Sequence, residues 1–136
     1  MKKSDLCPCC SSKNYGDCCN LFLGSSTSAP TAEQLMRSRY TAFALEKAVY
    51  LVETHHPQAR EPDELKALKK SFKGMVWMGL EIVATQAGAE TDSDGEVEFI
   101  AHFKSSGKKG QLHERSRFRQ ENGQWFYVDG AILSDA

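Results

Sequence analysis

The chain has 136 residues and a formal net charge of −1, and 40% of its residues are hydrophobic. This length fits one ordinary domain plus a small N-terminal module, and the balanced charge gives no overall attraction to nucleic acid or to an anionic membrane. No apolar run approaches the roughly 20 residues of a membrane-spanning helix. We therefore expect a soluble, cytoplasmic protein without a membrane partner.

All five cysteines fall near the N-terminus: Cys7, Cys9, Cys10, Cys18 and Cys19. Two thiols one residue apart, followed after eight residues by an adjacent pair, can be aimed at one point by a short hairpin-like loop. Zinc in tetrahedral geometry suits four such soft ligands best, and a closed set of four ligands leaves no position for substrate. The spacing therefore predicts a structural zinc site.

A disulfide framework fits this cluster less well than a metal does. The number of cysteines is odd, and none lies beyond residue 19 to act as a partner. Iron, copper(I) and thiol redox chemistry are less favoured than zinc but compatible with the same residues. Because Cys9 and Cys10 are neighbours, only one of them fits a four-coordinate site. Cys9 is the predicted ligand, together with Cys7, Cys18 and Cys19.

Small polar residues separate the cysteine cluster from the rest of the chain. They predict a metal-binding module over 1–24, a linker over 25–30 that acts as a hinge or spacer, and a domain over 31–136. Thr31 and Gln34 form a predicted capping box, and the apolar spacing after them predicts one helix over 32–54. Pro62 should open a second helix that runs to about residue 72.

From residue 75 onward the apolar period changes to two, which predicts four strands. The first, over 75–84, is apolar on both sides and should be buried on both faces at one end. The second has one apolar face, made by Val97, Phe99, Ala101 and Phe103. Strands over 111–120 and 124–133 are joined by an Asn-Gly turn and should form a hairpin. Helices followed by an antiparallel meander indicate an α+β fold.

Two parts of the sequence carry a family resemblance. The run Cys-Pro-Cys-x-Ser-x-Lys-x-Tyr-x-x-Cys-Cys resembles the SEC-C motif, the zinc-binding module at the C-terminus of the SecA translocase. Residues 29–43 and 113–118 resemble the YchJ-like family of uncharacterised bacterial proteins, and this likeness covers nearly the whole chain. Cys10 and Ser12 stand where the motif usually has glycine, which could strain the turn or let Cys10 compete for the metal.

The resemblance implies both a fold and a ligand set. It implies a small zinc knuckle followed by a domain similar to nuclear transport factor 2 (NTF2). Such a domain is a cone of two or three helices packed on a curved, antiparallel four-stranded sheet. It also implies that the zinc ligands are Cys7, Cys9, Cys18 and Cys19. The family has no settled activity, so the resemblance says more about the fold than about the function.

The pattern of the third predicted strand places polar side chains inside the cone. If Leu112 and Phe118 point inward, strict alternation carries Glu114 and Ser116 inward with them. A buried carboxylate must be paired, hydrogen-bonded or protonated.

Two interpretations of Glu114 follow. In the structural one, Arg39 or Arg37 of the long helix pairs with Glu114 and fixes the helix on the sheet. In the functional one, Glu114 is a base or an anchor for a polar ligand in a pocket that includes Ser116, Tyr40 and Trp77. The structural interpretation is favoured by the sequence, and no reaction class can be assigned.

Three functions are compatible with these features. The first is a protein adaptor, in which the knuckle docks on a partner much as the SEC-C tail of SecA is thought to contact its export chaperone or the ribosome. The second is a small-molecule-binding protein or enzyme that uses the cone, with Glu114 as the ionisable group. The third is RNA or ribosome binding through the knuckle and a basic stripe made by Arg115, Arg117 and Arg119, with Lys108 and Lys109 nearby. The balanced overall charge makes nucleic acid the least favoured partner.

Overall fold

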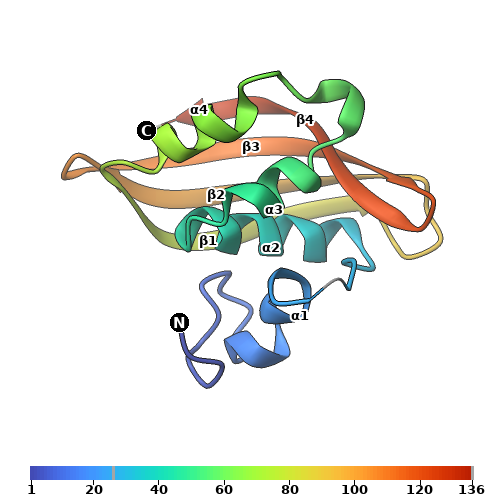
Figure 1. The fold of residues 1–136 in the computed structure, drawn as a ribbon, viewed down its shortest axis with the longest axis horizontal. Helices are drawn as coiled ribbons and strands as arrows, with labels where there is room; N and C mark the ends of the chain where they lie inside the picture. The colour runs from blue at the N-terminus through green and yellow to red at the C-terminus, as the bar shows by residue number, and fades with distance from the viewer. Residues whose placement is uncertain (26, 136) are drawn as a thin grey trace.

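The computed structural model describes residues 1–25 and 27–135, so that Ser26 of the expected linker and the terminal Ala136 lie outside the described residues. Three helices cover one face of a curved four-stranded sheet, and the N-terminal module lies against the helical layer beside α2 (Figure 1). The elements in chain order are η1 (Tyr15–Asp17), α1 (Asn20–Leu23), α2 (Ala32–Ala44), α3 (Ala48–Glu53), η2 (Pro57–Ala59), α4 (Glu64–Ser71), β1 (Met75–Ala87), β2 (Asp94–Ser105), β3 (Lys108–Glu121) and β4 (Gln124–Asp135).

The sheet is an antiparallel meander in the order β1-β2-β3-β4. The turns that join its last three strands have positive φ at both central residues: 50° and 85° at Ser106 and Gly107, and 53° and 78° at Asn122 and Gly123. This geometry matches the right-handed twist of a two-residue hairpin. The α+β prediction and the Asn-Gly hairpin are therefore confirmed.

The helix expected over 32–54 is two helices, so the prediction of a single helix is wrong. Thr31 caps α2 as expected, because its Oγ1 accepts the backbone N–H of Gln34 at 3.1 Å. The break after α2 is a Schellman motif in which the N–H of Lys47 bonds the carbonyl of Ala42 at 2.8 Å and Glu46 has a φ of 59°. Glutamate seldom adopts positive φ, so the sequence carries no glycine signal for this helix end.

The first strand is covered on one face, which corrects the expectation of burial on both. Val76 and Met78 are 59% and 53% exposed on the outer face of the sheet. Leu80 of the same strand is buried beneath the helices. Local apolar content cannot distinguish the two faces, because burial depends on which side the helical layer covers.

The core joins the N-terminal module to the cone. Buried residues of the module, including Cys9 and Phe22, belong to the same hydrophobic cluster as Leu35 of α2 and Trp125 of β4. The end of the linker is also tied down, because the Trp125 indole donates to the carbonyl of Pro30 at 3.1 Å. Among residues 1–25 and 27–135, no helix combines the length and apolar character needed to cross a bilayer.

Candidate metal centre and candidate ligand cavity

The N-terminal module is a small knuckle built from two turns. An antiparallel bridge joins Leu6 to Asn14, and the N–H of Cys10 bonds the carbonyl of Cys7 at 3.2 Å. Cys10 and Ser12 have φ values of 64° and 72°. These two positions, where the motif usually has glycine, do adopt the left-handed conformation that glycine reaches most easily.

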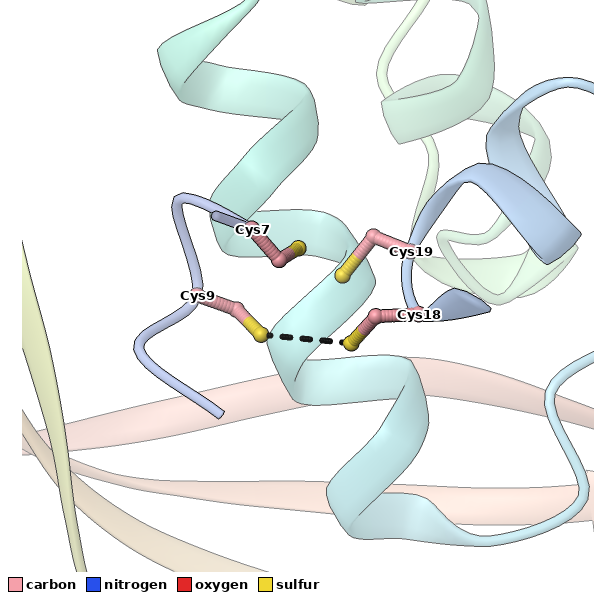
Figure 2. Close-up of side chains that lie close together, drawn as sticks. All are labelled: Cys7, Cys9, Cys18 and Cys19. Carbon is pink, nitrogen blue, oxygen red and sulfur yellow. Dashed lines mark hydrogen bonds between the residues drawn. The ribbon is translucent and has the colours of Figure 1, made fainter. Parts of the chain in front are cut away.

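The knuckle brings four thiols together. The Sγ atoms of Cys7, Cys9, Cys18 and Cys19 all lie within 4.8 Å of one another and point into a common space (Figure 2). The Sγ atoms of Cys9 and Cys18 are 3.6 Å apart. Four sulfurs bound at about 2.3 Å around a tetrahedral zinc lie about 3.8 Å from each other. The cluster can therefore bind a metal ion, and its all-sulfur donor set fits zinc.

Cys10 is directed away from this cluster. Its side chain is exposed, and its Sγ accepts the backbone N–H of Leu80 on β1 at 3.4 Å. The thiols of Cys7, Cys9 and Cys19 are buried. Because Cys10 already contacts the edge of the sheet, it is placed outside the set of four thiols rather than in competition with them.

Helix α2 provides the outer contacts of the cluster. The Thr41 hydroxyl is fully buried and donates to the Sγ of Cys19 at 3.2 Å, and Nη1 of Arg37 donates to the carbonyl of Cys9 at 2.8 Å. Partners of this kind orient the ligands of a metal and adjust their basicity. They also fix the knuckle on the cone.

The ionisation of the cluster favours a bound cation. Hydrogen bonds from the thiols of Cys19 and Cys9 lower the pKa of Cys7 to about 3. The same contact with Cys7, followed by Cys9 and by burial, raises the pKa of Cys19 far above its ordinary value. One thiolate therefore forms readily and further negative charge is resisted, which a divalent cation would relieve.

A second candidate site is a cavity between the helices and the sheet. Its volume is about 420 Å³, within the range of about 300–1,000 Å³ that is usual for small-molecule sites. Most of its wall is apolar and aromatic, as in Phe43 of α2, Phe72 after α4, and Trp77 of β1. The site residues named from the sequence, Glu114, Ser116, Tyr40, Trp77 and Arg39, all line this cavity.

The polar groups of the cavity are arranged differently from the expected ion pair. Ser116 donates to a carboxylate oxygen of Glu114 at 2.6 Å. Within the described residues, no salt bridge joins Glu114 to Arg39 or Arg37. Arg37 instead pairs with Glu33 at 3.0 Å on the opposite side of α2. Glu114 is therefore a cavity residue that is hydrogen-bonded within its own strand.

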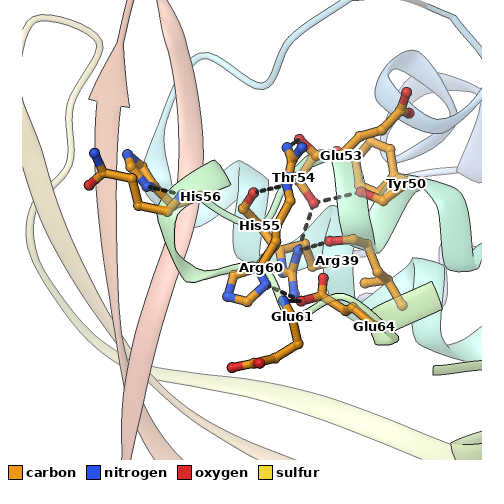
Figure 3. A network of polar contacts seen from close by, with 11 residues as sticks. Arg39, Tyr50, Glu53, Thr54, His55, His56, Arg60, Glu61 and Glu64 are labelled. Carbon is orange, nitrogen blue, oxygen red and sulfur yellow. Dashed lines mark hydrogen bonds and ion pairs between the residues drawn. The ribbon is translucent and has the colours of Figure 1, made fainter. Parts of the chain in front are cut away.

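Arg39, which lines the cavity, also belongs to a network of polar contacts (Figure 3). Its Nη1 donates to the carbonyl of Leu51 at 2.8 Å and to Oγ1 of Thr54 at 2.7 Å. Its guanidinium carbon lies 4.7 Å from the ring centroid of Tyr127. Burial raises the pKa of Tyr127 to about 12, with the charge of Glu114 as the next cause. The alternation of β4 places Tyr127 on the cavity side of the sheet with Trp125.

The arginines expected to form a basic stripe are all matched by acids on the outer face of the sheet. Arg115 bonds Glu98 at 2.9 Å, and Arg117 forms a two-pronged pair with Asp129. Arg119 lies 3.8 Å from Asp94 and 3.9 Å from Glu121. At these three positions each positive charge is therefore paired with a negative one, which weakens the attraction that the arginines could exert on a nucleic acid backbone.

Comparisons with known proteins agree with the fold and with the cysteine cluster. Residues 31–130 match the model of the YchJ middle NTF2-like domain. The chain is 45% identical to a UPF0225 protein of Chromobacterium violaceum and 42% identical to one of Enterobacter sp. strain 638, each over 93% of this chain. The match covers 92% and 83% of those relatives.

Two solved structures of SEC-C motif-containing proteins are also similar. One, from Rhodopseudomonas palustris, is 36% identical with a TM-score of 0.84, and the match covers 94% of this chain and 98% of that one. The other, from Psychrobacter arcticus, is 31% identical with a TM-score of 0.75, covering 98% and 86%. An epoxide hydrolase of Mycobacterium tuberculosis shares the fold alone, at 11% identity and a TM-score of 0.54. The chain therefore belongs to the YchJ family, in which a SEC-C knuckle precedes an NTF2-like domain.

Proposed function

We propose that this protein binds a small, largely apolar molecule in the cavity of its NTF2-like domain, and that zinc held by Cys7, Cys9, Cys18 and Cys19 stabilises the scaffold. The observation that carries the proposal is the cavity itself, about 420 Å³ in volume, with aromatic walls and few polar groups. Ligand sites have this composition, because apolar walls supply affinity and a few polar groups fix orientation.

The metal has a structural role in this proposal. Four thiolates close the coordination sphere, and three of the four cysteines are buried, so that no position is open to substrate. Ligands that must stay reduced fit a reducing compartment, which supports the cytoplasmic location expected from the sequence.

A thermal-shift screen tests the cavity directly. Apolar compounds of different charge should include some that raise the melting temperature of the wild-type protein, because a ligand that binds only the folded state stabilises it. Ala101 is buried and lines the cavity, so Ala101→Leu should fill part of the space and abolish those shifts. Ala131→Leu, on an exposed position of β4, is the matched control and should keep them. A screen without any stabilising compound would remove the proposal.

A protein adaptor is the second candidate function. Its specific support is that the knuckle exposes two leucines, Leu6 at 69% and Leu21 at 48%. The partner class is the one that the SEC-C resemblance implies, an export chaperone or the ribosome. Co-sedimentation with ribosomes and pull-down of the chaperone should both be compared between the wild type and a Leu6→Ser, Leu21→Ser double variant. Equal recovery by the two proteins, or none by the wild type, would exclude this role.

A further inference from the structure

The cavity contains an enclosed cation that forms no salt bridge with a described acid. Arg39 is only 9% exposed, yet none of the salt bridges among the described side chains, those of residues 1–25 and 27–133, includes it. Its polar contacts with described residues are two hydrogen bonds from Nη1, to Leu51 and to Thr54 after α3, and the ring of Tyr127. A buried charge usually has an opposite charge as its partner, because leaving water is costly for an unpaired ion.

One edge of the Arg39 guanidinium is available to a ligand. Neither Nε nor Nη2 forms a hydrogen bond with a described residue. Every side-chain nitrogen or oxygen that is sealed from solvent in the described residues does have a partner, so these two nitrogens keep contact with open space. Arg39 lines the cavity, which supplies that space. The Nε and Nη2 edge of arginine matches the two oxygens of a carboxylate.

We propose that the ligand is a small monocarboxylate with an aliphatic or aromatic body, with its carboxylate on the free edge of Arg39 and its body against Phe43, Phe72 and Trp77. This inference rests on the proposed function and adds the chemical class of the ligand. Phe43 and Trp77 are 5.9 Å apart between ring centroids, and Phe43 and Phe72 are 6.3 Å apart, so the three rings form a continuous apolar wall.

Glu114 limits the charge of the ligand. Its carboxylate lines the same cavity, held by the hydroxyl of Ser116. Its charge opposes every further negative charge in the cavity, so a doubly charged phosphate monoester is disfavoured more strongly than a singly charged carboxylate. Burial also lowers the pKa of Arg39 to about 10, and the charges that oppose this shift, those of Tyr127, Tyr50, Glu64 and Glu114, do not cancel it. A bound carboxylate would supply the missing partner.

The first experiment compares octanoate with octanamide on the zinc-loaded wild-type protein. The two differ in charge but hardly in shape, and binding can be followed by calorimetry and by tryptophan fluorescence, since Trp77 lines the cavity. A charge-assisted pair in an enclosed site should make octanoate bind at least about tenfold more tightly. Equal affinities would overturn the carboxylate subsite while leaving the cavity as a ligand site. Binding of neutral compounds without binding of octanoate would likewise overturn the carboxylate subsite and leave the cavity as a ligand site. Failure of every compound would remove the proposed function as well.

The second experiment uses substitutions in the cavity. Arg39→Lys keeps the charge and a donor for the carbonyl of Leu51 but loses the planar edge, so the preference for octanoate should fall several-fold while the melting curve stays cooperative. Glu114→Gln removes the opposing charge and should tighten octanoate binding relative to Glu81→Gln, the control on the exposed outer face. An Arg39→Lys protein with the full wild-type preference, or a Glu114→Gln protein that binds octanoate more weakly, would overturn the inference.

Discussion

Helix α2 places two arginines in opposite situations, two residues apart. Arg37 faces the knuckle, where it pairs with Glu33 and donates to the carbonyl of Cys9. Arg39 faces the cavity and has no carboxylate partner among the described residues. Two residues of an α-helix are about 200° apart around its axis, so neighbouring side chains of one type serve different layers. On the knuckle side of α2 the Arg37 guanidinium is bonded within the protein, whereas on the cavity side Nε and Nη2 of Arg39 have no hydrogen-bond partner among the described residues.

The largest expected effect comes from removing the metal ligands. Cys18→Ser with Cys19→Ser should abolish zinc binding and lower the free energy of unfolding by more than about 4 kcal/mol, because the binding energy of structural zinc is folding energy. The knuckle and α2 share one hydrophobic cluster, so the cone should lose stability as well. Chemical denaturation followed by circular dichroism, with zinc measured in parallel, checks this.

Cys10→Ser is the matched control for the ligand variants. Cys10 is exposed and lies outside the group of four thiols. Zinc content and unfolding free energy should therefore stay close to the wild-type values. A loss of zinc in this variant would show that the ligand set is not the one described.

A smaller effect is expected at Thr41, on the knuckle side of α2. Thr41→Val keeps the shape but removes the hydroxyl that bonds the Sγ of Cys19. Loss of an outer partner should weaken zinc affinity by about 10-fold to 100-fold and stability by about 1–2 kcal/mol. Competition with a chelator measures the affinity. Thr85→Val, at an exposed position of β1, should leave it unchanged. Identical chelator titrations for the two variants would mean that α2 does not support the metal site.

On the cavity side, Gly130→Ala tests whether Glu114 is positioned by its surroundings. A Cβ at residue 130 would overlap the carboxylate of Glu114 and displace it from Ser116. The side chain can move, so the cost should be only about 1 kcal/mol. Ligand affinity should nevertheless change, as measured by calorimetry with octanoate. Gly79→Ala has room for the added methyl group and is the control. An unchanged affinity would indicate that the position of Glu114 does not matter.

The smallest expected effect is that of tyrosine ionisation, which does not change the stability of the protein at neutral pH. Burial raises the pKa of all four tyrosines, to about 12 for Tyr40 and Tyr127. The folded-state pKa lies above the ordinary value of 10.0, so their contribution to stability is complete below pH 10 and is lost as the pH rises toward 12. Ultraviolet absorbance should show Tyr40 and Tyr127 of the folded protein ionising only as the pH approaches 12. Titration of all four tyrosines near pH 10 would contradict the burial described for the rings of Tyr40 and Tyr127.

The sequence was most informative where a local pattern determines the structure. Alternation along β3 was enough to place Glu114 and Ser116 on the same face as Phe118, and cysteine spacing was enough to indicate a metal cluster. The helix break at Glu46 could not be predicted, because glutamate is common inside helices and its positive φ here has no signature in the sequence. The state of Arg39 depends on Thr54 and Tyr127, which lie 15 and 88 residues away in sequence, and therefore on tertiary contacts. The contact between the knuckle and Thr41 is also a tertiary contact and could not be predicted from the sequence.

The most direct test of the closed metal centre is a count of zinc and reactive thiols in protein purified without added metal. We expect one zinc ion per chain and one thiol that reacts freely, that of the exposed Cys10, with all five reacting once a chelator has removed the zinc. A protein that carries no zinc and has five freely reacting thiols from the start would contradict the metal-stabilised scaffold.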